Sequence, residues 1–547
     1  MSATEALSSN PAATEPPTQR RLPRWIAVFW GVAALLIAFL SLYEVNGDPG
    51  VSNLLRFLLG NLTVIVSLAW FLTTSRFAAR TRLTVFAVLA GCLALFLAFY
   101  RVEGVRGDLA FFNFSSRWGA PAWDALDAPA TSARTVDLER QTPYDFTGFQ
   151  GSNRDGLVTG VRLAHGRLAE APETLWRQPI GGGWSGFAVV NGFAATVEQR
   201  DATELVTLYD VDTGALIWSH VLEEGDAFAS VVAGKGPRST PAIADGVVYA
   251  VSVYGKLVAL DGSSGSPVWE RDLSSDQGLT REREKQLFAY GRAGSPLVVG
   301  DRVVVPLGGD PAGGPIASVA AYSRADGELY WSGGTQLFNM ASPQWLDLGG
   351  VEQIAMVNEG SINGYDMESG RELWGLEWPG RTSGDSSVSQ ARAVGDDRLF
   401  VSKGYGHGAA LYEMRLNRED GTFAPEPVWQ SSRVLRTKFT NVVFRGDQIY
   451  GLSEGVLECV DLATGERVWK HGRYGHGQIL LVDDVLVVLT EEGEVVFVEA
   501  TPERRDNVLG RFQAIEGQTW NTFAIAGDRL LVRNAQEAAA FRLPLEG

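Results

Sequence analysis

Polar and aromatic side chains recur in this sequence just before the apolar segment that opens each of its repeating units. Those that could hold a ligand are Trp184, Arg238, Arg292, Lys438, Asn441 and Trp520, and Arg392 occupies an equivalent place. Arginine and lysine side chains that converge on one point attract an anion, because they pair with carboxylates. A tryptophan beside them can stack on a planar ring. These residue types predict a site for a flat anionic ligand, if the fold brings them together.

The same positions also have a purely structural explanation. The ends of inner strands in a ring-shaped fold need polar side chains to satisfy backbone N–H and C=O groups. An arginine in such a place can pair with a nearby aspartate or glutamate. Both explanations stay open at the level of sequence.

Other kinds of chemistry find little support. Five histidines are scattered along the chain, at positions 165, 220, 407, 471 and 476. Only His471 and His476 are close together, and no carboxylate is evident beside them, so we expect a solvated loop and no metal site. No Ser/His/Asp signature of a nucleophile is present. Two cysteines, Cys92 and Cys459, give no disulfide framework.

The composition argues against a nucleic-acid partner. The chain has 547 residues with 47 Lys and Arg against 64 Asp and Glu, a net charge of −17. Such a chain does not neutralise phosphates over a broad surface. Glycine is abundant at 62 residues and comes with 16 tryptophans, a combination that indicates many tight turns and many large packing residues.

The elements that must position the candidate residues follow from a repeated phrase, Asp-x-x-Thr/Ser-Gly-x-x-x-Trp. Its four full copies end at Trp218, Trp269, Trp374 and Trp469. The aspartate and hydroxyl side chains can bond their own turn, and glycine supplies a positive φ. The phrase therefore predicts a β-hairpin whose tryptophan packs against the backbone of a neighbouring unit.

A second turn signal, a pair of turn residues inside an apolar run, falls between the copies of this phrase. It occurs eight times, at residues 191–192, 245–246, 300–301, 349–350, 396–397, 446–447, 483–484 and 527–528. Each unit then has two hairpins, or four antiparallel strands, in roughly 35–60 residues, which is the period of a propeller blade. Stacked sheets of this kind bury their faces against one another.

The two ends of the repeat region complement each other. The last unit lacks a final strand with a tryptophan, whereas Thr174–Ile180 is an isolated strand that carries Trp176. We expect this first strand to complete the last blade. The sequence thus predicts an all-β, eight-bladed propeller, with seven blades as the alternative if the unit that ends near Phe512 is irregular.

Three uncharged stretches precede the propeller: Trp25–Tyr43, Phe57–Ser75 and Leu83–Tyr100. Each is long enough, or nearly so, to cross a hydrocarbon core of about 30 Å as a helix. Arginines precede the first stretch and follow the second, which favours a cytoplasmic N-terminus. We therefore expect a multi-pass protein of the cytoplasmic (inner) membrane with its propeller on the periplasmic or extracellular side.

These features divide the chain into four expected parts. They are a disordered cytoplasmic tail (1–24), three transmembrane helices (25–103), a juxtamembrane linker (104–145) and the propeller (146–547). The linker contains Phe111, Phe112, Phe114, Trp118 and Trp123. Aromatic residues are enriched at the membrane interface, so we expect the linker to lie on the membrane. The alternative is a strap packed under the propeller.

The repeated phrase resembles the tryptophan-docking motif of the quinoprotein-like propellers. These include the alcohol and glucose dehydrogenases that use pyrroloquinoline quinone (PQQ) and the non-enzymatic outer-membrane assembly lipoprotein BamB. Residues 148–156, Gly-Phe-Gln-Gly-Ser-Asn-Arg-Asp-Gly, are similar to the segment that opens the propeller in bacterial PQQ-like repeat proteins. The resemblance implies an eight-bladed fold in which each tryptophan stacks on a glycine peptide of the next blade.

The resemblance leaves activity open, because unrelated functions share this fold. PQQ alcohol dehydrogenases have a disulfide between adjacent cysteines, which this sequence lacks, and the glucose enzymes have an anchor of more than three helices. We therefore expect a non-catalytic module that binds a protein or an envelope polymer, holds no cofactor and is tethered to membrane lipid. The alternative is a membrane dehydrogenase for an alcohol or sugar with PQQ and Ca²⁺ bound at Trp184, Arg238, Arg292, Lys438, Asn441 and Trp520.

Overall fold

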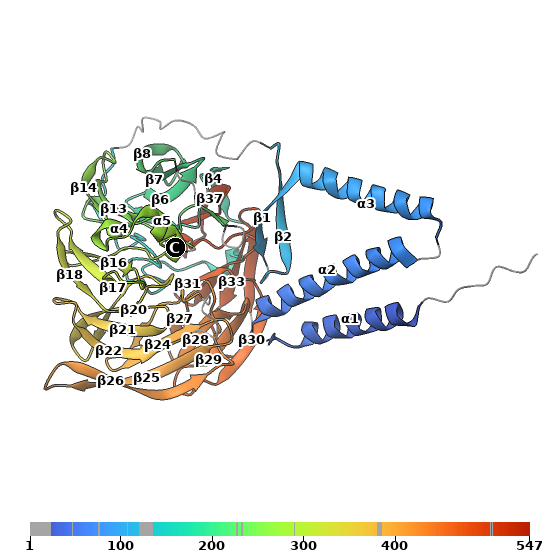
Figure 1. The fold of residues 1–547 in the computed structure, drawn as a ribbon. Coiled ribbons are helices and arrows are strands. Elements are labelled where there is room, and N and C mark those ends of the chain that lie inside the picture. The colour runs from blue at the N-terminus through green and yellow to red at the C-terminus, as the bar shows by residue number, and fades with distance from the viewer. Residues whose placement is uncertain are drawn as a thin grey trace, which may run out of the picture. The chain divides into compact units, whose positions relative to one another are not determined.

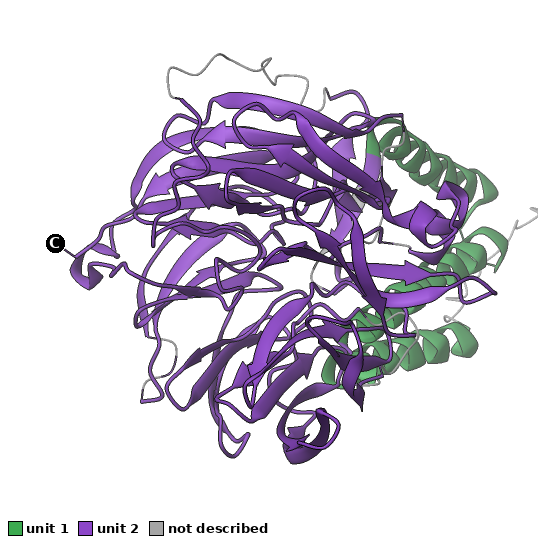
Figure 2. Ribbon diagram, turned by 90° about the vertical axis from the view of Figure 1, so that its left-hand side faces the viewer, with its two compact units in different colours: residues 1–45, 49–100 green, residues 46–48, 101–547 purple. Residues whose placement is uncertain are grey.

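The structure is a computed structural model, and it divides into two compact units. It describes residues 23–45, 48–74, 77–106, 108–119, 135–225, 228–230, 234–288, 290–379, 386–503, 505 and 507–546. The first unit is Met1–Val45 with Pro49–Tyr100, and the second is Asn46–Asp48 with Arg101–Gly547 (Figure 2). Residues 1–22 of the tail expected at 1–24 lie outside the described residues.

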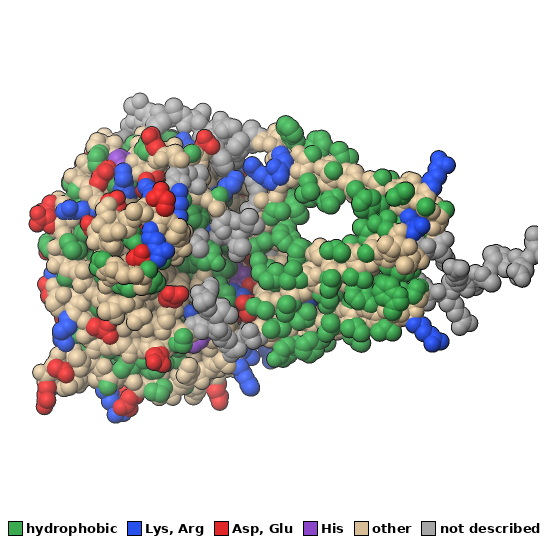
Figure 3. Space-filling model, viewed as in Figure 1, with side chains coloured by type: hydrophobic (Ala, Val, Ile, Leu, Met, Phe, Trp, Pro, Cys, Tyr) green, Lys and Arg blue, Asp and Glu red, His purple; other side chains and the backbone are tan. Residues whose placement is uncertain are grey.

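The first unit consists of the three helices expected from the sequence. They are α1 (Arg24–Leu42), α2 (Pro49–Thr74) and α3 (Ala79–Phe99) (Figure 1). All three are long and apolar enough to cross a membrane, and apolar side chains cover their surfaces (Figure 3). Between α1 and α2, the Trp30 indole N–H donates to Ser67 Oγ at 2.9 Å. Arg56 Nη1 of α2 also donates to Ser41 Oγ of α1 at 3.3 Å, so polar groups connect the two helices while most of their large apolar side chains are exposed.

The second unit is built from sheets of four antiparallel strands, each strand paired with its neighbour in the chain. The first four sheets are β5–β8 (Ala188–Val190, Phe193–Arg200, Thr203–Asp210, Leu216–Glu223), β11–β14 (Ala242–Ala244, Val247–Val251, Lys256–Asp261, Pro267–Asp272), β15–β18 (Leu297–Val299, Arg302–Gly309, Ile316–Ser323, Leu329–Gly333) and β19–β22 (Gln344–Leu348, Val351–Val357, Ser361–Asp366, Glu372–Glu377).

Four more sheets complete the set in the described part of the chain. They are β23–β26 (Arg392–Val394, Arg398–Lys403, Gly408–Asn417, Thr422–Ser431), β27–β30 (Val443–Arg445, Gln448–Ser453, Val456–Asp461, Arg467–Arg473), β31–β34 (Gln478–Val482, Val485–Leu489, Glu494–Glu499, Val508–Gln513) with β3 (Leu157–Val158) added in parallel, and β35–β37 (Ala524–Ala526, Arg529–Arg533, Glu537–Arg542) with β4 (Glu173–Pro179).

Shorter elements lie between these sheets or before them. They are β1 (Tyr100–Arg106), β2 (Phe111–Ser116), a 3₁₀ turn (His165–Arg167), β9 (Ala229–Ser230), β10 (Gly234–Lys235), α4 (Leu273–Asp276) and α5 (Arg281–Leu287).

Both turn signals lie where the sequence predicted them. All eight turn pairs connect the first and second strands of a sheet, as Asn191 and Gly192 do between β5 and β6. These two residues have φ of 47° and 82°, the left-handed conformation that the mirror-image hairpin turns require. The four full copies of the repeated phrase connect third and fourth strands. Local turn chemistry therefore determines the first hairpin of every sheet and the second hairpin of four of them.

The ring closes through the first and last parts of the propeller. β4 pairs with β37, with Trp176 opposite Ala540, as the isolated strand at 174–180 predicted. The innermost strand β35 of this last sheet also contacts β5, the innermost strand of the first sheet. The propeller fold and its closure are confirmed, and the sheets are arranged around a centre lined by their first strands (Figure 1).

Tryptophans of six fourth strands in the described chain join neighbouring sheets. The Trp218 indole N–H donates to the Gly262 carbonyl of the next sheet at 3.0 Å, and a Cβ on Gly265 would come within 2.7 Å of the indole. The fourth strand of each sheet also has a β-bulge. In the first sheet the bulged residue is Ile217, because Trp218 pairs with Leu208 and Leu216 pairs with Tyr209, which leaves Ile217 without a partner residue in the ladder. A bulge turns a strand and re-aims its side chains, so it helps direct the indole toward the next sheet.

Residues 146–158 cross the centre of the propeller. Phe146 exchanges backbone hydrogen bonds with Val189 of the first sheet, and the Gly156 carbonyl accepts one from Leu481 of the seventh. Between them, the buried Arg154 side chain donates to the carbonyls of Ser295 and Pro296, just before β15. This segment, which we call the plug, contains the residues that resembled a propeller-opening phrase, and it connects sheets that lie apart in the sequence.

The linker expected at 104–145 has more than one structure. Residues 100–116 form the β1–β2 hairpin, whose Phe111 and Phe114 are exposed. Trp123 lies outside the described residues. Near residue 138 the chain packs against the propeller: Leu138 is buried, and its carbonyl accepts from Gly246 N. The expectation that the whole linker lies on a membrane is therefore wrong for this last part, which is a strap on the propeller because Leu138 has an apolar site to fill.

Candidate functional site

The structure brings three of the six predicted site residues together. Trp184, Arg238 and Trp520 line a cavity of about 160 Å³ at the centre of the propeller, which we call the channel pocket. Its other described lining residues are Phe149, Thr240, Tyr290, Ala293, Met340, Ser342, Ser386, Val388, Tyr405, Phe439, Gln478 and Thr522. Phe149 belongs to the plug. Most of the lining comes from the segments just before the inner strands, the position from which the sequence prediction started.

Aromatic rings form one side of the channel pocket. The centroids of Trp184 and Trp520 are 5.0 Å apart, and those of Phe439 and Trp520 are also 5.0 Å apart. Trp520 is held in place because its indole N–H donates to Glu491 Oε1 at 3.0 Å. The rings are tilted by 37° and 42° rather than parallel, so they form a curved apolar wall.

Arg238 is the cation of this pocket. Its guanidinium lies 5.0 Å from the Phe228 ring centroid and donates to the carbonyls of Gly236 and Tyr290. Burial lowers the pKa of Arg238 to about 10, which leaves the group protonated at neutral pH. The described residues that line the pocket include no aspartate or glutamate. The pocket therefore has a net positive lining in the described part of the chain.

Arg292 does not face the channel pocket. It is buried in an ion pair with Glu284 of α5, with Nε to Oε1 at 2.6 Å, and it also donates to the Leu307 carbonyl at 2.7 Å. Arg392 likewise donates to the carbonyls of Arg154 and Asp155 in the plug. The sequence predicted that Arg238, Arg292, Arg392 and Lys438 converge on one ligand. This prediction is wrong for Arg292, which pairs with Glu284, and for Arg392, which donates to the plug.

Lys438 lies in a buried group of five charged side chains, which we call the lysine cluster. The other members are Asp48, Asp108, Glu454 and His476. The ammonium is 2.9 Å from Asp48 Oδ1, 2.7 Å from Asp108 Oδ1 and 3.2 Å from Glu454 Oε2. Burial lowers the pKa of Lys438, but the three carboxylates outweigh it and raise the pKa above its usual value. Its charge is thus neutralised inside the protein.

His476 belongs to the same cluster, where it contacts Asp108 at 2.9 Å. The solvated loop expected around it is wrong for this residue, which is 5% exposed. Burial raises the pKa of Asp108, but the hydrogen bond from His476 and the charge of Lys438 dominate and lower it. The same contact with Asp108 raises the pKa of His476 against the effect of burial. Sequence analysis missed Asp108, since nothing in the β1–β2 turn marks it as a partner of residue 476.

Asp108, Glu454 and His476 have the ligand types and the spacing of a metal site, with their ligand atoms within 4.8 Å of one another. The ammonium of Lys438 lies against the same two carboxylates. It provides the positive charge that a buried acidic pair needs, so these residues form an ion network, although neither Glu454 oxygen accepts a hydrogen bond from the described residues.

Asn441, the last of the predicted site residues, has a structural role. Its side-chain oxygen accepts a hydrogen bond from the backbone N–H of Gln390 at 2.8 Å, and both residues are buried. It therefore connects the inner ends of two neighbouring sheets. This is the backbone-satisfying role that the sequence left open as an alternative.

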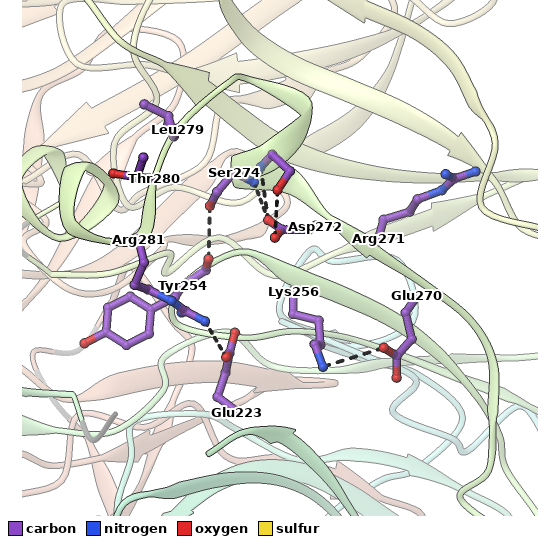
Figure 4. A pocket seen from close by; sticks show the side chains of 11 residues that line it. Glu223, Tyr254, Lys256, Glu270, Arg271, Asp272, Ser274, Leu279, Thr280 and Arg281 are labelled. Atoms are coloured by element: carbon purple, nitrogen blue, oxygen red, sulfur yellow. Dashed lines mark hydrogen bonds and ion pairs between the residues drawn. The ribbon is translucent and has the colours of Figure 1, made fainter. Parts of the chain in front are cut away.

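A second cavity, of about 510 Å³, was not predicted from the sequence (Figure 4). It lies between α4–α5 and the strands β8, β13 and β14. Two ion pairs line it: Arg281 Nη2 to Glu223 Oε2 at 2.5 Å, and Lys256 Nζ to Glu270 Oε2 at 3.6 Å. Cations and carboxylates are balanced among its described lining residues, so its charge selects no particular ligand.

The family described as "Outer membrane protein assembly factor BamB" matches residues 202–471. The protein of that name from Shewanella oneidensis is 24% identical over 288 residues, which are 50% of this chain and 66% of the relative. The chain is a PQQ-like propeller protein. It spans about two thirds of that relative's length.

Quinoprotein enzymes are also similar to this PQQ-like propeller. The "Quinohemoprotein alcohol dehydrogenase ADH-IIG" of Pseudomonas putida is 25% identical over 275 residues, 47% of this chain and 34% of the enzyme. The crystal structure of quinohemoprotein alcohol dehydrogenase from Comamonas testosteroni has a TM-score of 0.50 at 13% identity, covering 75% of this chain and 83% of that one. At this identity the structural likeness shows the fold alone.

The channel pocket does not fit PQQ. PQQ is a tricyclic molecule with three carboxylates, and the described lining offers one cation and no carboxylate for Ca²⁺. The cavity of about 160 Å³ is also below the roughly 300–1,000 Å³ of pockets for drug-sized ligands. Arg292 and Lys438, which the sequence assigned to the same ligand, are paired elsewhere. No catalytic step through this cofactor follows from the residues present.

Proposed function

We propose that this protein is a non-catalytic, membrane-tethered propeller that binds other proteins on the outer side of the cytoplasmic membrane. The observation that carries the proposal is the internal use of Arg292, Arg392 and Lys438, which in a cofactor site would have to face the ligand. The similarity to an outer membrane protein assembly factor supports a role in protein interaction. The three apolar helices support the tether, and the arginines that flank them support the orientation.

A surface suited to a protein partner lies on two neighbouring sheets. Val268 on β14 and Tyr330 on β18 are the bulge residues that precede a joining tryptophan, and they are 52% and 47% exposed. Leu329 beside Tyr330 is 50% exposed. Trp269 joins these two sheets, because its indole N–H donates to the Arg324 carbonyl. A protein partner would desolvate these side chains, and tyrosine in particular commonly anchors interfaces.

The proposal is tested by site-specific photocrosslinking in the native membrane. A photoreactive residue at Val268 or Tyr330 should give one discrete crosslinked protein, whereas the same residue at Val468 on β30, which is 40% exposed, should not. Equal crosslinking at all three positions, or none at any, would contradict the proposed surface. Reporter fusions after residue 545 test the orientation: a reporter active only outside the cytoplasm should be active, and a cytoplasmic reporter should not.

The second candidate is a membrane quinoprotein dehydrogenase. It is favoured by the tryptophans and the arginine that line the channel pocket and by the similarity to alcohol dehydrogenases. It differs from the first candidate in requiring a bound redox cofactor, which direct titration detects.

A further inference from the structure

The β1–β2 hairpin follows directly on the last apolar helix. α3 ends at Phe99, and β1 begins at Tyr100. The Tyr100 ring stacks on Phe96 of the helix, with centroids 5.2 Å apart. A strand rises about 3.3 Å per residue, so the first residues of β1 stay close to the end of α3. Where α3 crosses a membrane, the hairpin therefore begins at the membrane surface.

One face of this hairpin is apolar. Arg101 Nε donates to Ser115 Oγ at 3.2 Å, so these two residues are neighbours across the strands. Successive side chains point to opposite faces of a strand, which places Val102 and Phe114, the next residues along, together on the other face. They are 41% and 49% exposed, and the Phe112 ring lies 6.4 Å from that of Phe114. This face, which we call the aromatic face, consists of Tyr100, Val102, Phe112 and Phe114.

The propeller holds the rest of the hairpin. Asn113, whose side chain lies on the face opposite to Phe112 and Phe114, donates to Gln518 Oε1 at 2.9 Å. Gln518 Nε2 donates to the Val105 carbonyl at 2.9 Å. Asp108, in the turn, pairs with Lys438 at 2.7 Å. The hairpin thus has a fixed position on the propeller, and its aromatic face is directed away from the contact with Gln518.

The residue types of this surface fit the boundary between lipid and water. Phe111 at the start of β2 and Trp118 just after its end are 61% and 75% exposed and enlarge the apolar surface. Exposed apolar patches mark sites of interaction, and tyrosine and tryptophan are enriched where an apolar environment meets water. Because the chain enters the hairpin straight from α3, the lipid surface is the apolar environment within its reach.

We propose that the aromatic face of the β1–β2 hairpin inserts into the membrane interface on the outer side and thereby fixes the orientation of the propeller on the membrane. Its rings lie about 5–10 Å deep, at the boundary of headgroups and acyl chains, as in other interfacial amphipathic elements. This inference rests on the membrane tether in the proposed function, and it adds a membrane contact that the helices do not provide.

The test is depth-dependent fluorescence quenching on the full chain in lipid nanodiscs, with nitroxides carried on the lipid either near the headgroup or deep in the acyl chain. Native Cys92 is exposed on α3 and accepts a fluorophore, whereas Cys459 is buried. In a Cys92→Ser background, Val102→Cys and Phe114→Cys place the same fluorophore on the aromatic face. Val468→Cys places it on β30 of the propeller, where Val468 is 40% exposed.

We expect the shallow nitroxide to quench the labels at positions 102 and 114 at least about twofold more than the deep one. The Cys92 label should be quenched more by the deep nitroxide, and the label at position 468 by neither. Ser115→Cys, on the opposite face of β2, should be quenched less than Phe114→Cys. Thermal unfolding of each labelled protein shows that it is folded.

Two results separate this inference from the tether on which it rests. Quenching at Cys92 with none at positions 102 and 114 would overturn the inference and leave the tether intact. No quenching at Cys92 would contradict the tether itself, and the inference with it. Equal quenching at positions 114 and 115 would also overturn the inference, because the two faces of the hairpin would then not differ.

Discussion

We call the contact between two neighbouring sheets a joint, and two joints of the propeller are packed in different ways. At one, the Trp331 indole N–H donates to the Met367 carbonyl of the next sheet at 3.0 Å, and its ring covers Gly370. At the other, the Trp374 indole donates to Gln353 Oε1 at 2.5 Å, within its own sheet. Both tryptophans end the same kind of turn phrase or a close copy of it. The tryptophan alone therefore does not decide the joint.

The difference lies in the sheet that follows. Beyond Trp374, the repeated turn is replaced by a long hairpin, β25–β26, whose strands extend ten residues each. Phe423 of this hairpin is buried in one cluster with Leu373 and Trp374. At Trp374 the turn of the next unit lies at the far end of this longer hairpin, and apolar side chains of the hairpin fill the joint.

The largest effect is expected at the unusual joint. Phe423→Ala should destabilise the propeller by about 3–5 kcal/mol, because it opens a cavity in the cluster that replaces tryptophan docking. Val428→Ala on the same strand is the control, since Val428 is 47% exposed, and it should cost no more than about 0.5 kcal/mol. Thermal or urea unfolding measures both. Equal effects would show that the hairpin does not fill the joint.

A somewhat smaller effect is expected at an ordinary joint. A Cβ on Gly465 would come within 2.4 Å of the Trp429 indole, and Gly465 has φ of 71°. Gly465→Ala should therefore cost about 2–4 kcal/mol, from backbone strain together with a clash. Gly446→Ala has a similar positive φ of 55° but nothing within 4 Å, so it should cost only about 1–2 kcal/mol. If the two variants unfold alike, the contact with tryptophan contributes nothing.

The smallest effect concerns a polar contact across the joint made by Trp218. Glu204 on β7 accepts from the Val253 N–H of the next sheet at 3.1 Å, and burial raises the pKa of Glu204 to about 8. A carboxyl that is protonated when folded loses stability as pH rises from its unfolded pKa near 4.5 toward 8.

Glu204→Gln should remove this dependence and raise stability at pH 7 by up to about 3 kcal/mol, at 1.36 kcal/mol for each pH unit between 4.5 and 7. Unfolding curves of both proteins between pH 4.5 and 8 make the comparison. A wild-type protein that becomes more stable over this range would contradict the assignment.

Much of the fold could be predicted because its signals are local. Turn pairs such as Asn191-Gly192 determine hairpins through the φ of two residues. The isolated strand that carries Trp176 predicted the closure of the ring, and this strand pairs with β37. The joint at Trp374 could not be predicted from its own unit, since the glycine that receives a tryptophan belongs to the next unit.

The candidate site was less predictable for a related reason. Trp184, Arg238 and Trp520 meet because inner strands share one end of a ring, which topology dictates. The partners of Lys438 are 330 and 390 residues away in the sequence, at Asp108 and Asp48. No spacing rule links such positions, and a lysine that serves an internal ion network has the same sequence signal as one that binds a ligand.

Titration of the purified full chain with PQQ and Ca²⁺ tests the central claim most directly, namely that the cations near the centre serve the protein's own structure rather than a redox cofactor. With Arg292 and Lys438 committed to Glu284 and to the lysine cluster, we predict no saturable change in cofactor absorbance and no dye reduction with a panel of alcohols and aldoses. A saturable spectral change at micromolar PQQ, with dye reduction that Arg238→Ala abolishes, would contradict the account.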